Sequence, residues 1–329
     1  MDIKELMAKI NKKYGKGSLM HANDMKKGEK RITSGSAFLD WALGGTGDNA
    51  GFPLGRIIEL YGKESSGKSL ICLKAIADAQ KKGIGCVYFD CEKSFDRKYA
   101  TELGVDVKKL ILSRENIGEV VIEMMAEMLR SKKIKIIVVD SLASMIPTRE
   151  LEDDMKDQQM ALVARMMSKA LRKLTALNSD TLIVFINQLR ERPGVMYGNP
   201  EYTPGGKALG FYSSIRIAVR RGDWIVTKKE KVGQVVKFRV TKNKTAIPLR
   251  EGFFKYLYTG EIDKIDELIS LGELNGTLKR RGAYYYVGEE GYRGRADLES
   301  NLKSDKALLK KVRKIVLGDE DKLKKKGDK

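Results

Sequence analysis

Residues 56–69 read RIIELYGKESSGKS, and this stretch decides the fold. The run RIIELY is typical of a buried β-strand, and GKESSGKS matches the pattern GxxxxGKS/T between a strand and a helix. The glycines let successive N–H groups face an anion, and the start of the helix adds its positive dipole end. Lys68 would reach the β- and γ-phosphates of a nucleotide, and Ser69 would ligate Mg²⁺. The alternative is a Gly/Ser-rich turn that carries a chance lysine.

The runs that follow predict an α/β fold around a mostly parallel sheet. Further β-rich runs lie at 85–90, 109–113, 134–140 and 181–187. Helices are predicted at 69–82, 93–103, 117–131 and 158–177. Alternating strands and helices imply a parallel sheet with helices on both faces. Three runs with no helix between them, 213–219, 234–240 and 253–258, predict an antiparallel extension.

Both ends of the chain have a different pattern from the middle. Apolar residues at helical spacing predict an amphipathic helix at 3–14, which packs either on its own core or on a neighbouring subunit. Beyond residue 262 we expect a small α+β unit. Its predicted elements are a helix at 262–271, a hairpin at 283–294 and a helix at 296–317. The expected domains are therefore an N-terminal arm (1–30), a core (31–262), a small C-terminal domain (263–317) and a charged tail (318–329).

Composition excludes several classes of function. His21 is the one histidine among 329 residues, which rules out multi-histidine metal sites. Three cysteines without a CxxC pattern argue against a disulfide scaffold or a zinc ribbon. No apolar run approaches the roughly 18 residues of a membrane span, and the N-terminus does not resemble a signal peptide, so we expect a cytoplasmic protein without a membrane partner. The formal net charge of +19 favours a polyanionic partner such as nucleic acid.

Polar residues at the ends of three predicted strands complete a candidate nucleotide site. Asp140 follows the apolar residues of a predicted buried strand. The acid that supports Mg²⁺ in P-loop proteins has the same position at the end of a strand. Glu92 follows a neighbouring strand and is the candidate base for an attacking water, whereas Asp90 better suits a capping role. A third strand ends in Asn187 and Gln188, and a neutral amide there could report the γ-phosphate without adding charge.

Residues 189–212 follow Gln188 and have no regular pattern. This stretch combines glycines and prolines with basic and aromatic residues, including Arg190, Arg192, Tyr197 and Tyr202. Basic groups interleaved with aromatic rings suit single-stranded nucleic acid, through phosphate contacts and base stacking. A flexible linker is the alternative interpretation.

The ordered set of motifs resembles the bacterial RecA recombinases along nearly the whole chain, from about residue 3 to 317. The motifs are GKESSGKS, FDCEKSFD, IIVVDS, FINQLRERPGVMYGNPEYTPGG and TKNKTAIP. The resemblance implies a P-loop, DNA-dependent ATPase that forms helical filaments on single-stranded DNA and exchanges strands with double-stranded DNA, using ATP and Mg²⁺. It also implies that the N-terminal helix is a polymerisation arm and that 263–317 handle duplex DNA.

The resemblance also implies individual site residues. Glu92 would be the catalytic glutamate, Gln188 would couple the γ-phosphate to the following loop, and Lys242 and Lys244 would reach a neighbouring subunit's γ-phosphate. Nucleotide contacts would come from Gly62, Glu64, Ser65, Ser66, Gly67, Lys68, Ser69, Tyr99 (on the adenine) and Asp140. Ser69 and Asp140 would hold Mg²⁺, the latter through water. DNA contacts would come from Met160, Arg165, Arg172, Arg190, Arg192, Gly194, Val195, Met196, Tyr197, Gly198, Asn199, Gly205 and Gly206.

Three rival functions remain open at this stage. A ring-shaped RecA-fold DNA helicase would share the phosphate site but unwind forked duplexes. A non-catalytic, filament-forming mediator would bind ATP and DNA only, and Glu92 argues against it. A small-molecule P-loop kinase would have no use for the basic stretch 189–212 or for the charge of +19.

Overall fold

The computed structural model describes residues 2–24, 30–152, 160–191 and 201–318. The chain divides into two compact units, Met1–Lys30 and Arg31–Lys329, which we describe separately. The finer division of the second unit at residues 262 and 317 stays a prediction.

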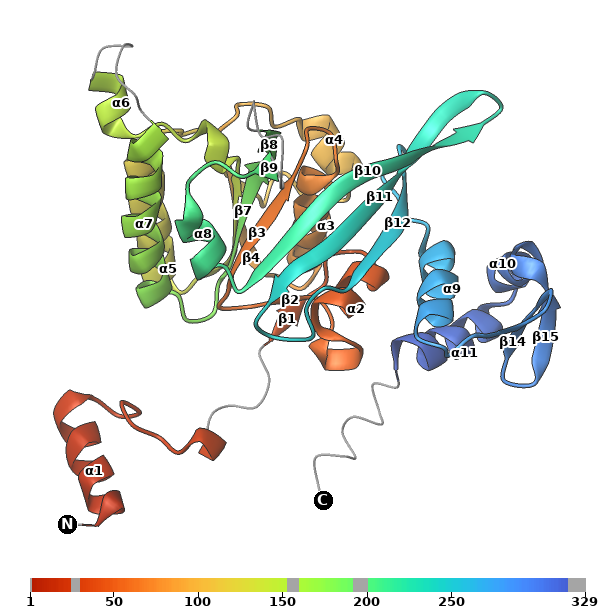
Figure 1. Ribbon diagram of the computed structural model, residues 1–329, viewed down its shortest axis with the longest axis horizontal. Helices are drawn as coiled ribbons and strands as arrows, with labels where there is room; N and C mark the ends of the chain where they lie inside the picture. The colour runs from red at the N-terminus through yellow and green to blue at the C-terminus, as the bar shows by residue number, and fades with distance from the viewer. Residues whose placement is uncertain (1, 25–29, 153–159, 192–200, 319–329) are drawn as a thin grey trace. The chain divides into compact units, whose positions relative to one another are not determined.

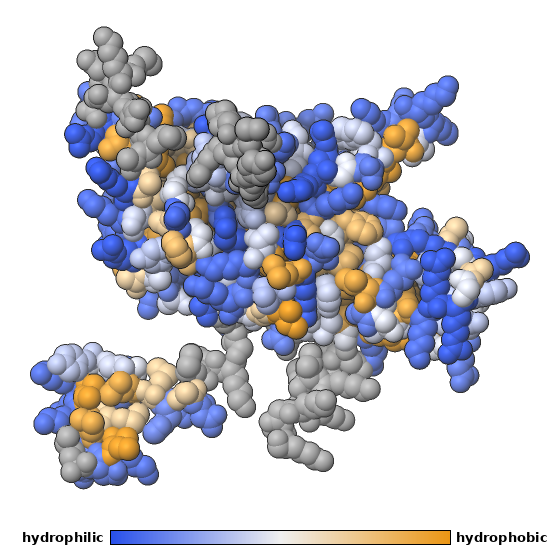
Figure 2. All heavy atoms as spheres, viewed as in Figure 1, coloured by the Kyte–Doolittle hydropathy of each residue, from blue (hydrophilic) through white to orange (hydrophobic). Residues whose placement is uncertain are grey.

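The described part of the N-terminal unit contains one α-helix, followed by a stretch with a single short 3-10 helix. Helix α1 (Ile3–Tyr14) opens with a capping box, in which the Asp2 N–H donates to the Glu5 carboxylate across 3.2 Å, and it ends at Gly15. A 3-10 helix follows at Ala22–Asp24. None of the residues of α1 is buried, and Figure 2 shows apolar side chains over this unit. The predicted helix at 3–14 is therefore confirmed, with its apolar stripe uncovered within this unit.

An eight-stranded sheet organises the described part of the second unit (Figure 1). Its spatial order is β12-β11-β10-β3-β7-β6-β4-β5. The strands are β3 (Ile57–Gly62), β4 (Gly85–Asp90), β5 (Ile111–Ser113), β6 (Ile134–Asp140), β7 (Leu182–Gln188), β10 (Ile215–Thr227), β11 (Glu230–Asn243) and β12 (Glu251–Leu257). Strands β3 to β7 pair in parallel, β10 joins β3 in parallel, and β11 and β12 are antiparallel additions. The predicted α/β fold and its antiparallel extension are thus confirmed.

Helices cover both faces of the sheet, because its central strands are apolar on both sides. In β6, Ile136 and Val138 belong to one core cluster, whereas Ile137 and Val139 belong to another. Helix α3 packs into the first cluster, and α5 and α7 pack into the second. The helices of this part are α2 (Ala37–Gly44), α3 (Lys68–Lys81), α4 (Arg97–Glu102), α5 (Gly118–Ser131), α6 (Thr148–Glu152), α7 (Met160–Leu177) and α8 (Lys207–Tyr212).

Short elements complete the described part of the core. The stretch 189–212, predicted to lack regular structure, contains two-residue strands at 190–191 and 201–202 and helix α8 at 207–212, so that prediction is wrong for those residues. Short 3-10 helices lie at Gly47–Asn49 and Leu142–Ser144. The short strands are β1 (Arg31–Ile32), β2 (Phe52–Pro53), β8 (Arg190–Glu191) and β9 (Glu201–Tyr202).

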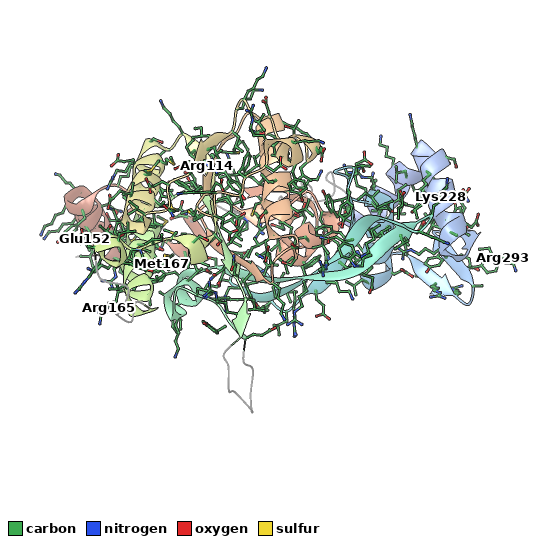
Figure 3. All side chains as sticks on the ribbon, turned by 90° about the horizontal axis from the view of Figure 1, so that it is seen from above. Arg114, Glu152, Arg165, Met167, Lys228 and Arg293 are labelled. Carbon is green, nitrogen blue, oxygen red and sulfur yellow. The ribbon has the colours of Figure 1, made fainter. Side chains whose placement is uncertain are left out.

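Strands β10 and β11 form a hairpin much longer than the predicted runs 213–219 and 234–240. Beyond Ala218, β10 pairs with β11 alone among the described strands, and register shifts lie at Arg221/Trp224 and Ile225/Val226. The turn is made by Lys228 and Lys229, both with positive φ (Lys228 is labelled in Figure 3).

The C-terminal elements form a small α+β layer beside β12. They are α9 (Lys264–Leu274), β13 (Lys279–Arg281), β14 (Tyr284–Val287), β15 (Glu290–Arg293), α10 (Gly294–Ser304) and α11 (Lys306–Leu317). The prediction of one continuous helix at 296–317 is wrong, because the structure has two helices there. Asp305 has extended backbone and accepts hydrogen bonds from the N–H groups of Ala307 and Leu308, so it ends α10 and caps α11.

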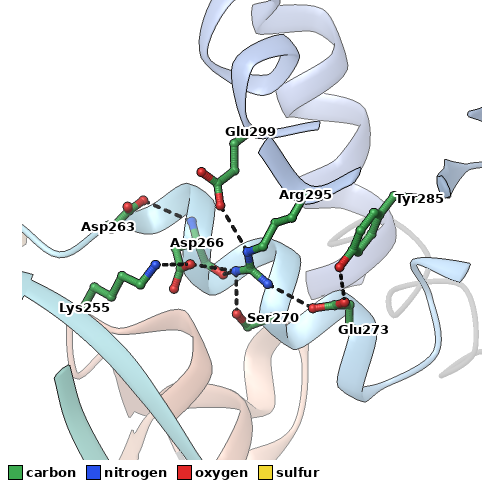
Figure 4. A network of polar contacts seen from close by, with 8 residues as sticks. All are labelled: Lys255, Asp263, Asp266, Ser270, Glu273, Tyr285, Arg295 and Glu299. Carbon is green, nitrogen blue, oxygen red and sulfur yellow. Dashed lines mark hydrogen bonds and ion pairs between the residues drawn. The ribbon is translucent and has the colours of Figure 1, made fainter. Parts of the chain in front are cut away.

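Two buried carboxylates join α9 to the rest of the sheet unit. Asp266 contacts Lys255 of β12 and Arg295 of α10, each at 2.7 Å, and Arg295 also contacts Glu273 and Glu299 (Figure 4). Glu267 accepts a hydrogen bond from the Ser36 hydroxyl at the start of α2. Burial raises the pKa of Glu267 to about 8, although hydrogen bonds from Ser36 and from the backbone oppose the shift.

Candidate nucleotide site

The loop between β3 and α3 has the geometry of a phosphate cradle. Gly67 has φ 103° immediately before Lys68, the first residue of α3. At Gly62 an added Cβ would lie 2.0 Å from the Val219 carbonyl oxygen, so no other residue fits without displacing the backbone. Among the described residues, the buried Ser66 hydroxyl has no hydrogen-bond partner. A ligand with phosphate oxygens would satisfy such a loop.

Lys68 folds back over this loop. Its Nζ donates to the Gly62 carbonyl at 3.1 Å and to the Lys63 carbonyl at 2.8 Å. Burial lowers the pKa of Lys68, while the charges of Asp140 and Glu92 work in the opposite direction. The ammonium group is thus paired with backbone carbonyls and lies in the field of both carboxylates.

Asp140 lies at the end of β6, where two hydroxyl groups meet its carboxylate. Ser69 donates to Oδ2 at 2.7 Å, and Tyr88 of β4 donates to the same oxygen at 2.5 Å. Burial raises the pKa of Asp140, and the two hydrogen bonds oppose that effect. Mg²⁺ favours oxygen ligands and usually binds through one or two protein groups together with phosphates and water, which fits Ser69 and Asp140. No cluster of three or more His, Cys, Asp or Glu suited to a metal occurs in the described ranges.

Glu92 lies beside Asp140 in a second group of contacts. Its Oε1 accepts hydrogen bonds from the Ser141 hydroxyl at 2.5 Å and from the Gln188 amide at 2.9 Å. Strands β4 and β6 pair Asp90 with Asp140, and β3 and β7 pair Gly62 with Gln188, so these side chains share one edge of the sheet. Asp90 instead accepts N–H groups of Ser94 and Phe95, as a capping residue does. The structure therefore groups the phosphate loop with Asp140, Glu92 and Gln188.

Other predicted nucleotide residues lie apart from this group. Lys242 and Lys244 donate to carbonyls at the end of α8, Lys242 to Gly210 at 2.6 Å and both lysines to Phe211. The Tyr99 hydroxyl is hydrogen-bonded to Tyr256 on β12. Among the described residues of one chain, their hydrogen bonds are therefore with α8 and β12 and not with the phosphate loop.

The predicted DNA residues fall into two sets. Arg165 and Arg172 are exposed on α7, seven residues apart and hence on one face, whereas Met167 is fully buried (Figure 3). Met160 begins α7. Outside the described residues lie Arg192, Gly194, Val195, Met196, Tyr197, Gly198 and Asn199.

A cavity of about 1390 Å³ lies beside the described ends of the stretch 189–212. Its lining includes Arg190, Gly205 and Gly206 with the cations Arg216 and Lys242. Side chains at the two glycines would collide with Leu142 and Ala164, at 2.6 and 2.9 Å, and both glycines have positive φ. The close approach of this segment to the core therefore requires glycine at both positions.

Sequence reasoning missed four residues in or behind the site, which are Tyr88, Ser141, Glu59 and Arg216. Tyr88 and Ser141 hydrogen-bond the two carboxylates, as described above. Buried Glu59 pairs with Arg216 at 2.6 Å and accepts from the Asn187 amide, which also binds the Pro204 carbonyl. The one available signal was a charged residue inside the apolar run RIIELY, because a buried charge needs a partner.

The fold and this site define the class of the protein. It is a P-loop ATPase with a glutamate at the carboxyl edge of a parallel sheet. The model of the RecA N-terminal domain matches residues 1–263. The chain is 42% identical over 323 residues to Protein RecA of Mycoplasma mycoides subsp. mycoides SC, covering 96% of this chain and 92% of that protein. It is 43% identical over 315 residues to Protein RecA of Mycoplasma mobile, covering 94% of each.

A relative from another genus gives the same result. Identity to Protein RecA of Chloroherpeton thalassium is 42% over 307 residues, covering 92% of this chain and 85% of that protein. The chain therefore belongs to the RecA family, and it is a recombinase of the DNA-dependent ATPase class. In the described residues, no helix combines the length and apolar character needed to cross a membrane.

Proposed function

We propose that the chain binds ATP with Mg²⁺, forms helical filaments on single-stranded DNA, and exchanges that strand with duplex DNA. The observation that carries the proposal is Glu92, which lies near Lys68 and Asp140 and is hydrogen-bonded by Gln188 and Ser141. A binding-only protein would not need a glutamate in that position. Gln188 also directly precedes the stretch 189–212, which we expect to contact DNA, so it would join hydrolysis to DNA binding.

Each residue has a distinct task in this proposal. The N–H groups of residues 62–69 and Lys68 hold the phosphates, and Ser69 and Asp140 hold Mg²⁺, which would neutralise charge on the β- and γ-phosphates. Glu92 orients an attacking water and accepts its proton. Ser141 and Gln188 fix the carboxylate that does so, because both donate to the same oxygen.

Assembly would complete the site. Among the described residues, Lys242 and Lys244 donate hydrogen bonds to carbonyls of α8, and we expect them to exchange those partners for a neighbour's γ-phosphate. The exposed apolar side chains of Ile3, Leu6 and Tyr14 would pack α1 against a second copy of the chain. Each Å² of apolar surface buried in this way favours association by about 25 cal/mol.

DNA would lie along the cationic surface of α7 and the stretch 189–212. Arg165 and Arg172 present two charges on one face of α7, and Arg190 lines the adjacent cavity. Contacts of this kind release counterions, so affinity for single-stranded DNA should fall steeply with salt.

Electron microscopy with ATP, with and without single-stranded DNA, tests the assembly, and DNA-stimulated phosphate release tests the chemistry. We expect helical filaments on DNA. Closed rings that unwind forked duplexes would replace the proposal with a helicase, and filaments without hydrolysis would replace it with a binding-only mediator. Leu6→Asp should abolish filaments, whereas Lys9→Asp on the same helix is the matched control.

A further inference from the structure

Tyr88 is a buried tyrosine whose hydroxyl lies at the proposed Mg²⁺ site. Only 3% of its surface is exposed, and its ring packs against Phe95 with 5.3 Å between centroids. It comes from the middle of β4, opposite Val138 of β6, so its backbone is held in the sheet. A tyrosine buried to this extent needs a polar partner for its hydroxyl. That partner is Oδ2 of Asp140, at 2.5 Å.

Ser69 donates to the same oxygen at 2.7 Å. Asp140 Oδ2 thus accepts two hydroxyl groups, and among the described residues Oδ1 receives no hydrogen bond. Oδ1 is therefore the atom that remains for Mg²⁺ or for a water bound to it. The two donors differ in their expected roles. Ser69 would itself ligate the metal, whereas Tyr88 would keep its hydrogen bond to the Asp140 carboxylate.

We propose that Tyr88 is a positioning residue that orients the Asp140 carboxylate for Mg²⁺ and thereby sets the affinity of the site for the metal. The proposal rests on the Mg²⁺–ATP site proposed above. Partners that hydrogen-bond a metal-binding group fix its orientation, and their loss costs about tenfold or more in metal affinity. The Tyr88 ring is packed in the core, so its hydroxyl keeps one position. Ser69, in contrast, would exchange its hydrogen bond to Asp140 for the metal when Mg²⁺ binds.

The test is Tyr88→Phe, which removes one oxygen atom and keeps the ring. Binding of a fluorescent ATP analogue is titrated with Mg²⁺, so that no hydrolysis is required. We expect the half-saturating Mg²⁺ concentration to rise about tenfold, with nucleotide binding in the absence of Mg²⁺ unchanged. The matched control is Tyr285→Phe, because the Tyr285 hydroxyl also donates to a carboxylate, Glu273 at 2.6 Å, but does so in the C-terminal layer.

A second variant keeps the test decisive if the first is less stable. In an Asp140→Asn background, Tyr88→Phe should have no further effect on Mg²⁺ dependence, because the residue acts through the carboxylate. A half-saturating Mg²⁺ concentration equal to that of the unmodified protein, or equal additional losses in both backgrounds, would overturn the proposal. Absence of any Mg²⁺ dependence in the unmodified protein would overturn the metal site itself, which separates the two failures.

Discussion

The side-chain amide of Gln188 donates to Oε1 of Glu92 across 2.9 Å, although 96 positions separate the two residues. Gln188 ends β7 and Glu92 follows β4, so the contact crosses from one strand end to another. A change in the position of either side chain must alter the other's hydrogen bonding. This contact links the proposed base to the residue that immediately precedes the stretch 189–212.

Glu92→Gln should lower ATP hydrolysis by on the order of 10², the scale expected for loss of a general base. Nucleotide binding should persist, because the amide keeps the shape of the side chain and an oxygen for the Ser141 hydroxyl. Phosphate release with DNA and equilibrium nucleotide binding measure the two effects. The control is Glu115→Gln, whose carboxylate accepts backbone N–H groups near the start of α5. A decrease of only a few-fold would place the base elsewhere.

Gln188→Leu should reduce DNA-stimulated hydrolysis by about ten- to a hundredfold, because a hydrogen bond to a charged group contributes about 1.5–3 kcal/mol. Nucleotide affinity should not change, since Gln188 contacts the carboxylate and not the phosphate loop's lysine. Gln80→Leu is the control: Gln80 hydrogen-bonds the backbone of Asp106, far along the chain from this site. Equal DNA stimulation in the Gln188 variant and the unmodified protein would contradict the coupling.

Lys242→Ala should uncouple ATP binding from tight DNA binding without unfolding the chain, because we propose that the lysine acts on a neighbour's nucleotide. Mixing it with Lys68→Ala protein should restore part of the hydrolysis, since some interfaces then combine an intact loop with an intact lysine. Lys237→Ala, an exposed lysine of the same strand, is the control. A mixture no more active than its two components would count against a role across the interface.

Glu267→Gln should make stability less dependent on pH. Burial raises the pKa of Glu267 to about 8, so between the unfolded value near 4.5 and 8 the unfolded chain binds fewer protons, and stability falls as pH rises. The slope is at most about 1.4 kcal/mol per pH unit. Glutamine resembles the protonated acid and removes this slope.

Denaturant unfolding from pH 6 to 8 measures the change. Burial raises the pKa of the neighbouring Asp40 to about 6, so its own contribution lies mostly below this range. The exposed Glu127→Gln is the control. A slope in the Glu267 variant as steep as that of the unmodified protein would refute the assignment.

Strand order along the chain and the phosphate loop could be predicted because each is encoded locally. The run 134–140 is mostly apolar and ends in Asp140, which predicts a buried strand. The pattern at 62–69 predicts a phosphate-binding loop from its own residues. The break in the last helix was local too, since Ser304 and Asp305 are residues that cap helices, but the apolar spacing of 296–317 runs through them and concealed it.

The contacts of Tyr88 and Ser141 could not be predicted in the same way. Each depends on the register between β4 and β6, and a shift of one residue would turn Tyr88 to the other face of the sheet. The long hairpin was missed because 220–231 is rich in charge and its turn uses Lys228 and Lys229 in place of glycine. Tertiary pairing, and not local propensity, decides both.

The outer half of the β10–β11 hairpin has an unpaired strand edge, and its sequence opposes aggregation through that edge. Beyond Ala218 one side of β10 lacks a partner strand in the described sheet, and an unpaired strand edge is a template for aggregation. The register shifts twist this edge, and Arg221, Lys228 and Lys229 place like charges along it. Two such edges repel each other instead of joining. If the chain polymerises as we propose, this edge stays out of the assembly, and other faces carry self-recognition.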